Sequence, residues 1–175
     1  MGCTEPIALA YAAAVARKTL GEMPDKVVVE ASGSIIKNVK SVIVPNTGHL
    51  KGINAAAAAG IVAGDPDKKL EVIATVSQEQ IRQMKQFMKE VPIQVVHMED
   101  GCTFDIIVTV FSGKSYAKVR IANFHTNIVL IEKNGEVLKS EAVSDDSEEG
   151  LTDRTLLDME HIWDFAMTAD IDDVK

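Results

Sequence analysis

The sequence predicts an α+β fold. N-terminal helices, one of them rich in Ala and Gly, pack with a mainly antiparallel sheet, and an amphipathic helix closes the chain. Two observations carry this prediction. Residues 7–20 and 54–63 are dominated by small or strongly helix-forming side chains and contain few helix breakers. From Ile93 onwards, apolar and β-branched side chains follow the period of two that is typical of strands.

The first predicted helix, residues 7–20, begins directly after a short polar motif. Thr4 is a candidate N-cap, and Glu5 and Pro6 fall in the first turn, where a carboxylate suits the helix dipole and proline loses no hydrogen bond. Cys3 then lies just outside a helix N-terminus, where unpaired amides favour a thiolate. From residue chemistry alone, Cys3 is either a metal ligand or a cysteine with a lowered pKa and no function.

The next segments, 27–31 and 41–44, are predicted to be short strands or extended segments on either side of a turn at Gly33. The Ala- and Gly-rich helix 54–63 follows. Its small side chains present little apolar area, so we expect a neighbour or ligand to approach its backbone closely. A large partner outside these residues would fit its smooth surface.

A second, amphipathic helix is marked by a capping box formed by Ser77 and Gln80. Beyond it, a meander is predicted. Its strands are 93–98, 104–111, 116–123 and 128–133. Asn134-Gly135 is a strong signal for a type I′ hairpin leading into Val137 and Leu138.

The C-terminal part is strongly acidic. Residues 141–175 carry twelve acidic and two basic side chains, in a chain whose net charge is −8. We expect a solvated acidic loop at 141–151, then a last helix that starts at Thr152 or Asp153 and frays near Asp170. Residues 1–175 are predicted to form a single α+β region.

Composition limits the function classes. The chain is 46% hydrophobic and 5% aromatic, which is typical of a globular protein, and its acidity argues against nucleic-acid binding. The ~20 consecutive apolar residues of a membrane span do not occur, so a membrane function has no support. Cys3 and Cys102 form no local pair, which favours a reducing, cytoplasmic setting.

Three stretches carry a family resemblance. Gly2-Cys3-Thr4-Glu5-Pro6, hereafter the N-terminal motif, precedes an Ala-rich helix. Residues 44–48 lead through the second Ala-rich helix to 63–66, and His125-Thr126-Asn127-Ile128 is followed by residues 132–136. In this order they resemble the L-cysteine desulfidase and L-serine dehydratase alpha-chain superfamily. The match spans nearly the whole chain.

The resemblance implies a lyase that converts a small amino acid to pyruvate, ammonia and either sulfide or water. It implies a 4Fe-4S cluster held by three cysteines, whose open iron binds the substrate and polarises the leaving group. By position, Cys3 is the N-terminal cluster ligand and Thr4 meets the substrate. Glu5 is either the general base or a dipole partner of the helix.

Two further polar clusters are candidate substrate-binding sites. They are Asn46, Thr47 and His49, and then His125, Thr126 and Asn127. The first cluster precedes the Ala-rich helix, whose first turn could cradle a carboxylate, but an ordinary polar loop is the alternative. The second cluster lines the site or belongs to a turn, and His125 alone is more often structural. His97, His161 and Cys102 match no metal spacing, and we expect all three to be structural.

Family members carry the other cluster cysteines in a long C-terminal half, so we expect these residues to be part of a longer catalytic chain and inactive alone. A split gene whose partner supplies the ligands, or a degenerate module, are the alternatives. A homo-oligomer is also expected. A second hypothesis is a non-catalytic small-molecule-binding or assembly module of the same fold.

Overall fold

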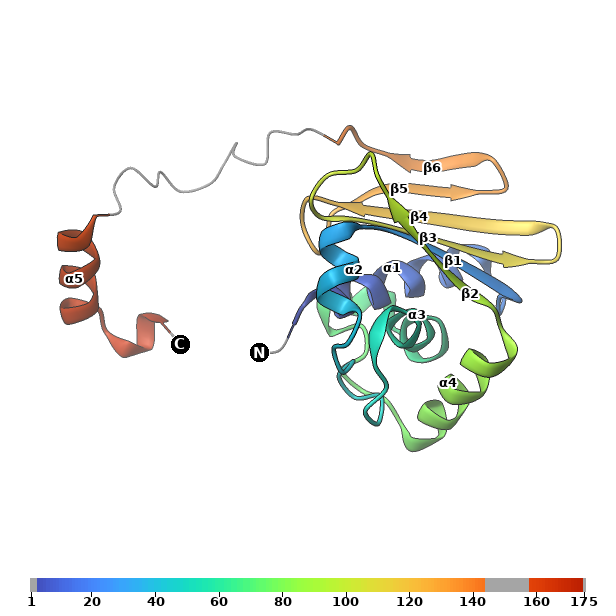
Figure 1. The fold of residues 1–175 in the computed structure, drawn as a ribbon, viewed down its shortest axis with the longest axis horizontal. Helices are drawn as coiled ribbons and strands as arrows, with labels where there is room; N and C mark the ends of the chain where they lie inside the picture. Colours follow the sequence, from blue (N-terminus) through green and yellow to red (C-terminus); the bar gives the residue numbers. More distant parts are fainter. Residues whose placement is uncertain (1–2, 144–157, 175) are drawn as a thin grey trace. The chain divides into compact units, whose positions relative to one another are not determined.

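A computed structural model describes residues 3–143 and 158–174, and the chain divides into two units, residues 1–143 and 144–175. In chain order, the elements of the first unit are α1 (Glu5–Leu20), β1 (Lys26–Ser32), α2 (Gly33–Val39), α3 (Gly52–Ala63), the 3-10 helix η1 (Pro66–Glu71), α4 (Gln78–Glu90), β2 (Ile93–Met98), β3 (Asp105–Ser112), β4 (Ser115–Ala122), β5 (Ile128–Lys133) and β6 (Glu136–Ser140). Figure 1 shows the sheet with the helices gathered against it. The predicted α+β fold is confirmed.

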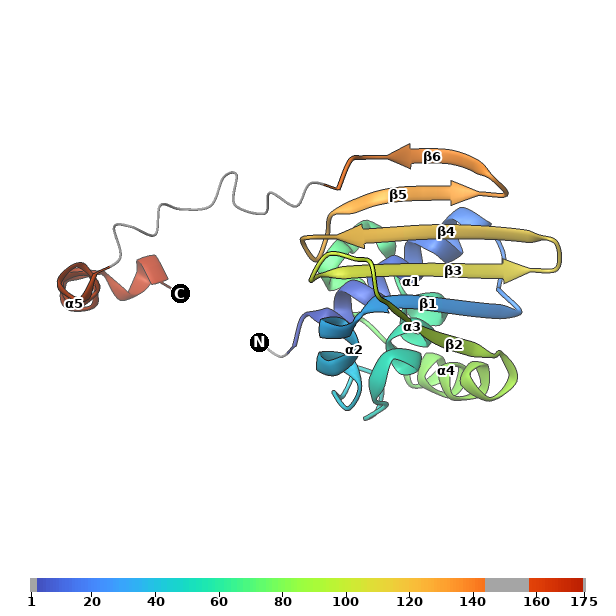
Figure 2. The same cartoon turned by 45° about the horizontal axis from the view of Figure 1, so that its top comes forward.

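The sheet has the strand order β2-β1-β3-β4-β5-β6, and Figure 2 shows the strands side by side. Strands β3 to β6 form the predicted antiparallel meander. The placement of β2 at the start of that meander is wrong, because β2 pairs in parallel with β1 at the sheet edge. Three α-helices and the 3-10 helix η1 lie between β1 and β2, and such a crossover is what brings two strands together in parallel.

Helix α1 packs against β3 and β4 on one side and against α3 on the other. Its alanines from Ala8 to Ala16 are completely buried, which explains why small side chains fill both faces. A Cβ on Gly60 of α3 would stand 2.0 Å from the carbonyl oxygen of Ala10. The close neighbour expected for α3 is therefore α1, and the expectation of a partner outside the chain is wrong for this face.

Two contacts set the direction of this helix pair. Gly60 lies against Ala10, and Gly64, just after α3, lies against Ala14. Both residue numbers rise by four, so α1 and α3 run parallel and their N-termini lie at the same end. The turn before α3 and the N-terminal motif before α1 therefore share one end of the helix pair.

Local signals gave mixed results elsewhere. The capping box of Ser77 and Gln80 is present at α4. Asn134 and Gly135 both have positive φ, as a type I′ hairpin requires, and they join β5 to β6. The predicted turn at Gly33 is wrong because α2 starts there, and the predicted strand 41–44 is reduced to one bridge between Ile43 and Lys51.

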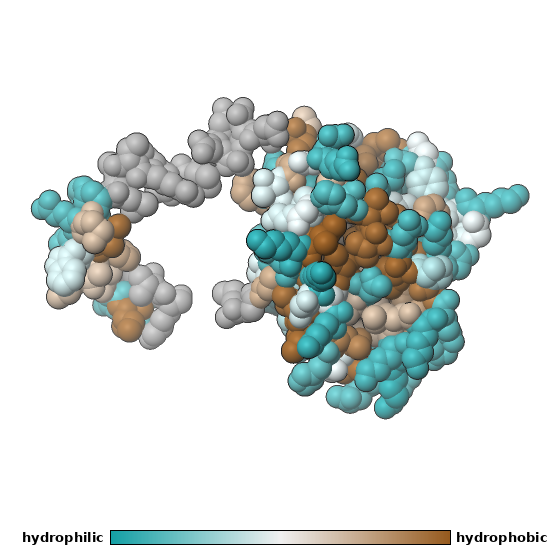
Figure 3. Space-filling view, in the orientation of Figure 1, coloured by the Kyte–Doolittle hydropathy of each residue, from teal (hydrophilic) through white to brown (hydrophobic). Residues whose placement is uncertain are grey.

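The second unit contains α5 (Met159–Thr168) and the 3-10 helix η3 (Ile171–Val174). Asp158 caps α5 by accepting a hydrogen bond from the backbone N–H of His161 at 2.8 Å. The predicted closing helix is thus present, although the starts proposed at Thr152 or Asp153 and most of the acidic loop 141–151 lie outside the described residues. Apolar side chains are exposed on the surface of this unit (Figure 3). Trp163 of α5 is 69% exposed.

Candidate active site at the start of helix α1

The N-terminal motif places a thiol beside a carboxylate. The Sγ atom of Cys3 donates a hydrogen bond to Oε2 of Glu5 at 2.8 Å. The other carboxylate oxygen, Oε1, accepts a hydrogen bond from Nδ2 of Asn38 in α2 at 3.2 Å. Both oxygens of Glu5 are therefore engaged, and the carboxylate is held between the chain that enters α1 and the end of α2.

These contacts shift the two acids in opposite directions. Burial raises the pKa of the Cys3 thiol, and its hydrogen bond to Glu5 raises it further. The pKa of Glu5 is lowered, first by the bond from Cys3 and to a smaller degree by Asn38 and the charge of His125. The thiolate expected at this helix end is therefore not favoured here, because burial and the neighbouring carboxylate together raise the pKa of the thiol more than the backbone amide lowers it.

Thr4 reaches across the chain instead of capping its own helix. Its side chain makes no capping hydrogen bond, which corrects the prediction from sequence. The Oγ1 atom of Thr4 lies 3.0 Å from Nε2 of His125, within hydrogen-bond distance. The imidazole also packs against the ring of Phe104 in a tilted arrangement, with ring centroids 4.5 Å apart. His125, a residue 121 positions away, is thereby brought to the motif.

These groups lie at one end of the strands. The end of β1, the start of β3, the end of β4 and the start of β5 all lie at the end of the sheet where α1 begins (Figures 1 and 2). Asn38 comes from the helix after β1, and His125 from the connection between β4 and β5. The arrangement combines a thiol, a carboxylate, an imidazole and an amide, and the first three of these groups can accept or donate a proton.

The turn before α3 has a largely structural role. The Thr47 hydroxyl is completely buried and donates to the carbonyl of Val44 at 2.8 Å. The Asn46 amide donates to the carbonyls of Ile73 and Ala74. His49 is exposed and has a φ of 68°. Among the described residues, no hydrogen bond joins this turn to the N-terminal motif, although both lie at the same end of the helix pair.

The rest of the predicted cluster around His125 braces the chain. The Asn127 amide donates to the carbonyl of Ala122 at 3.0 Å, closing the connection between β4 and β5. The carbonyl of Thr126 accepts from the backbone N–H of Ile128. Cys102 donates to the carbonyl of Phe104 and so has a structural contact.

A complete metal centre is not formed by these residues alone. Within residues 3–143 and 158–174, no group of three His, Cys, Asp or Glu side chains is placed to hold a metal ion. Cys3 is a single thiol, whereas the implied cluster needs three. The described residues therefore fit one ligand of such a cluster and not the whole site.

No helix among the described residues is long and apolar enough to cross a bilayer.

Sequence reasoning missed two partners of the site. Asn38 lies between the predicted turn at Gly33 and the predicted strand 41–44, where the sequence assigns no element, and its place on a helix beside Glu5 is therefore not predicted. Phe104 was assigned only as a strand residue. An aromatic residue followed by a charged one, Asp105, at the start of a strand is only a weak signal that the aromatic ring lies at a site.

The chain is similar to UPF0597 proteins. It is 54% identical to one from Desulfitobacterium hafniense, 43% identical to one from Lachnoclostridium phytofermentans and 42% identical to one from Treponema denticola. Each match takes in 100% of this chain and 41 or 42% of the relative, so the chain spans about two-fifths of the length of these curated relatives. No family model matches the chain, and no solved structure matches it.

Proposed function

We propose that this chain is the N-terminal portion of an iron-sulfur amino-acid lyase, similar to L-cysteine desulfidase or L-serine dehydratase, which releases pyruvate, ammonia and either sulfide or water. The observation that carries the proposal is the contact between Cys3 and Glu5 at the start of α1, beside His125. A thiol, a carboxylate and an imidazole in one place supply the ligand and proton-transfer groups that such a reaction needs.

Bound iron would supply a Lewis acid that polarises the leaving group. In this proposal Cys3 contributes one ligand, and the other ligands come from outside the described residues. Since a thiol must lose its proton to bind metal, Cys3 has to give up the proton that it now shares with Glu5. The Glu5 carboxylate is the nearest acceptor for that proton, which must then pass from Glu5 to solvent water.

After that proton has left, Glu5 is free to act as a base towards a substrate, while Asn38 keeps its carboxylate oriented. In this proposal Thr4 and His125, which contact one another near Glu5, bind a small polar substrate. The start of α1 adds backbone amides, which favour a carboxylate group. These roles identify no preference between serine and cysteine.

Pyruvate formation tests the proposal. A chain extended to the length of the relatives should be loaded anaerobically with iron and sulfide and supplied with L-cysteine or L-serine. We expect pyruvate from one of them, and a loss of about 100-fold or more in kcat for Glu5→Gln, the usual range for removing a general base. Glu79→Gln, an exposed substitution on α4, is the matched control. Unchanged kcat in Glu5→Gln would refute the assigned base.

A non-catalytic binding or assembly module is the second candidate. It is favoured by the lack of a three-ligand metal group among the described residues. This candidate predicts that serine or cysteine raises the melting temperature of the 175-residue chain in the absence of iron. It also predicts that the extended, iron-loaded protein makes no pyruvate.

A further inference from the structure

The imidazole of His125 is held from two sides. Thr4 contacts its Nε2 atom at 3.0 Å, and the Phe104 ring lies against it with centroids 4.5 Å apart and planes tilted by 53°. Aromatic contacts of this kind depend on geometry, so the position of Phe104 fixes the plane of the imidazole. What holds Phe104 therefore matters for the site.

The residue after Phe104 belongs to a buried ion pair. The Asp105 side chain is 0% exposed, and Arg120 donates to both of its oxygens, from Nε at 2.9 Å and from Nη2 at 2.6 Å. Two parallel hydrogen bonds from a planar guanidinium fix both the position and the orientation of a carboxylate. Asp105 is the first residue of β3, so the pair anchors the backbone at the point where Phe104 enters the sheet.

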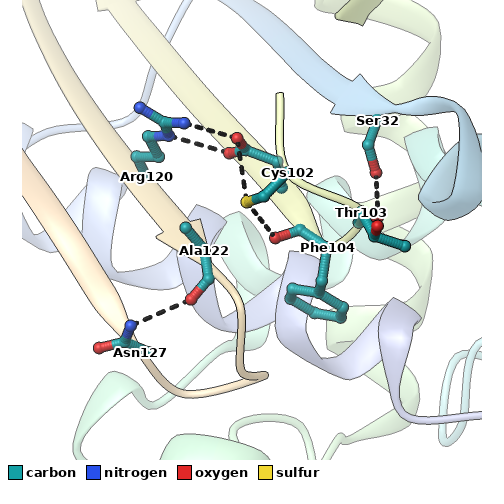
Figure 4. Close-up of polar contacts among 8 residues, drawn as sticks. Ser32, Cys102, Thr103, Phe104, Arg120, Ala122 and Asn127 are labelled. Atoms are coloured by element: carbon teal, nitrogen blue, oxygen red, sulfur yellow. Dashed lines mark hydrogen bonds and ion pairs between the residues drawn. The ribbon is translucent and has the colours of Figure 1, made fainter. Parts of the chain in front are cut away.

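The segment before Asp105 is fastened by further polar contacts, which Figure 4 shows. Cys102 donates to the carbonyl of Phe104 at 3.1 Å, and its Sγ lies 3.5 Å from Oδ2 of Asp105. Ser32, at the end of β1, donates to the carbonyl of Thr103 at 2.8 Å. The ring of Phe104 points away from Cys102 and Arg120. The polar contacts thus hold the backbone, and the ring is left to pack against His125.

The segment that carries His125 is tied to the same place. The backbone N–H of Asn123 donates to the carbonyl of Phe104 at 2.9 Å. Asn127 closes the connection by its bond to Ala122. A register shift between Arg120 and Ile121 lies at this end of β4, and such bulges often redirect a chain next to a site. Phe104 and His125 are therefore positioned by one shared set of contacts.

We propose that Asp105 and Arg120 are positioning residues, whose ion pair fixes Phe104 and thereby the orientation of the His125 imidazole at Thr4. The inference rests on the proposed function only in treating His125 as part of the active site. An ion pair with a merely structural role would change the stability of the fold when broken, and would leave the imidazole of a folded variant where it is.

The test is NMR of the 175-residue chain labelled at histidine, without metal or substrate. The chain has four histidines, and His125→Gln assigns the signal. Asp105→Asn keeps the shape of the side chain but loses its charge. Arg120→Lys keeps the charge but cannot donate two parallel hydrogen bonds. We expect both to shift the His125 ring signals in the direction produced by Phe104→Leu, which leaves the ion pair in place.

The ring signals of His97 and His161 should stay unchanged in all three variants. Asp67→Asn, which breaks the exposed pair with Lys18, is the matched control and should leave His125 unchanged. Arg120 is partly exposed, so if Asp105→Asn does not fold, Arg120→Lys decides. Unmoved His125 signals in either folded variant would overturn the inference. Because no iron is present, this result is independent of whether the lyase proposal holds.

Discussion

The Cys3 thiol donates a hydrogen bond to the Glu5 carboxylate across 2.8 Å, which places the first acid of α1 directly against the cysteine before it. The contact stabilises the protonated thiol and the ionised carboxylate together. Cys3 is thus less reactive than a cysteine at a free helix N-terminus, and its reactivity depends on Glu5.

Cys3 should react slowly with iodoacetamide at neutral pH, because burial and Glu5 raise the pKa of its thiol and the thiolate is the reactive form. Glu5→Gln removes the charge that favours the thiol, so the midpoint of the rate profile should move to lower pH. Mass spectrometry of the peptide that contains Cys3 measures the rate. Glu79→Gln should leave the profile unchanged, and an unchanged profile in Glu5→Gln would contradict the assigned cause.

The same pair should make stability depend on pH at the acid end. The pKa of Glu5 is lowered on folding, so its stabilising contribution is present above the unfolded pKa, about 4.3, and is lost as the pH falls through the lowered value. The free energy of unfolding, measured in urea between pH 3 and 7, should therefore fall less towards acid pH in Glu5→Gln than in wild type. Parallel curves for the two proteins would count against the contact.

Gly60→Ala should destabilise the fold severely. The added Cβ would stand 2.0 Å from the carbonyl oxygen of Ala10, which is backbone and cannot turn aside. We expect a loss of about 3 kcal/mol or more in the free energy of unfolding, at the upper end for overpacked cores. Asn54→Ala, an exposed change on the same helix, should stay within about 0.5 kcal/mol. Equal urea midpoints for wild type and Gly60→Ala would show that α1 and α3 are not in such close contact.

Arg120→Met should cost about 3–5 kcal/mol, because it leaves the Asp105 carboxylate buried without its partner. The double variant Asp105→Asn, Arg120→Met should recover part of that loss, since no buried charge is then left without a partner. Asp67→Asn, in the exposed pair with Lys18, should cost about 1 kcal/mol or less. Denaturant unfolding measures all three, and an equal cost for the two pairs would contradict the burial argument.

Local sequence signals predicted the elements that local interactions decide. The alanines of α1 and α3, the capping box at Ser77 and the hairpin at Asn134 each act within a few residues. The prediction failed at residues 33–39, where the short helix α2 forms although its Ile35 and Val39 favour strands. Both side chains are buried, so tertiary packing overrides the propensity.

The pairing of distant segments could not be predicted in the same way. The parallel partner of β1 is β2, more than sixty residues further on, and nothing in either strand encodes that choice. For the site, the motif around Cys3 was found from sequence because its residues are adjacent. The contacts of Glu5 with Asn38 and of Thr4 with His125 join residues that are distant in the sequence, and only the fold brings them together at one end of the strands.

Iron binding by cysteine variants tests the central claim most directly. The chain, extended to the length of its relatives, should be reconstituted anaerobically, and its iron content and cluster absorbance measured for Cys3→Ser and for Cys102→Ser. We predict that Cys3→Ser loses or destabilises the cluster, whereas Cys102→Ser, whose thiol contacts the carbonyl of Phe104, retains it. Full iron content and unchanged absorbance in Cys3→Ser would contradict the assignment of Cys3 as a ligand.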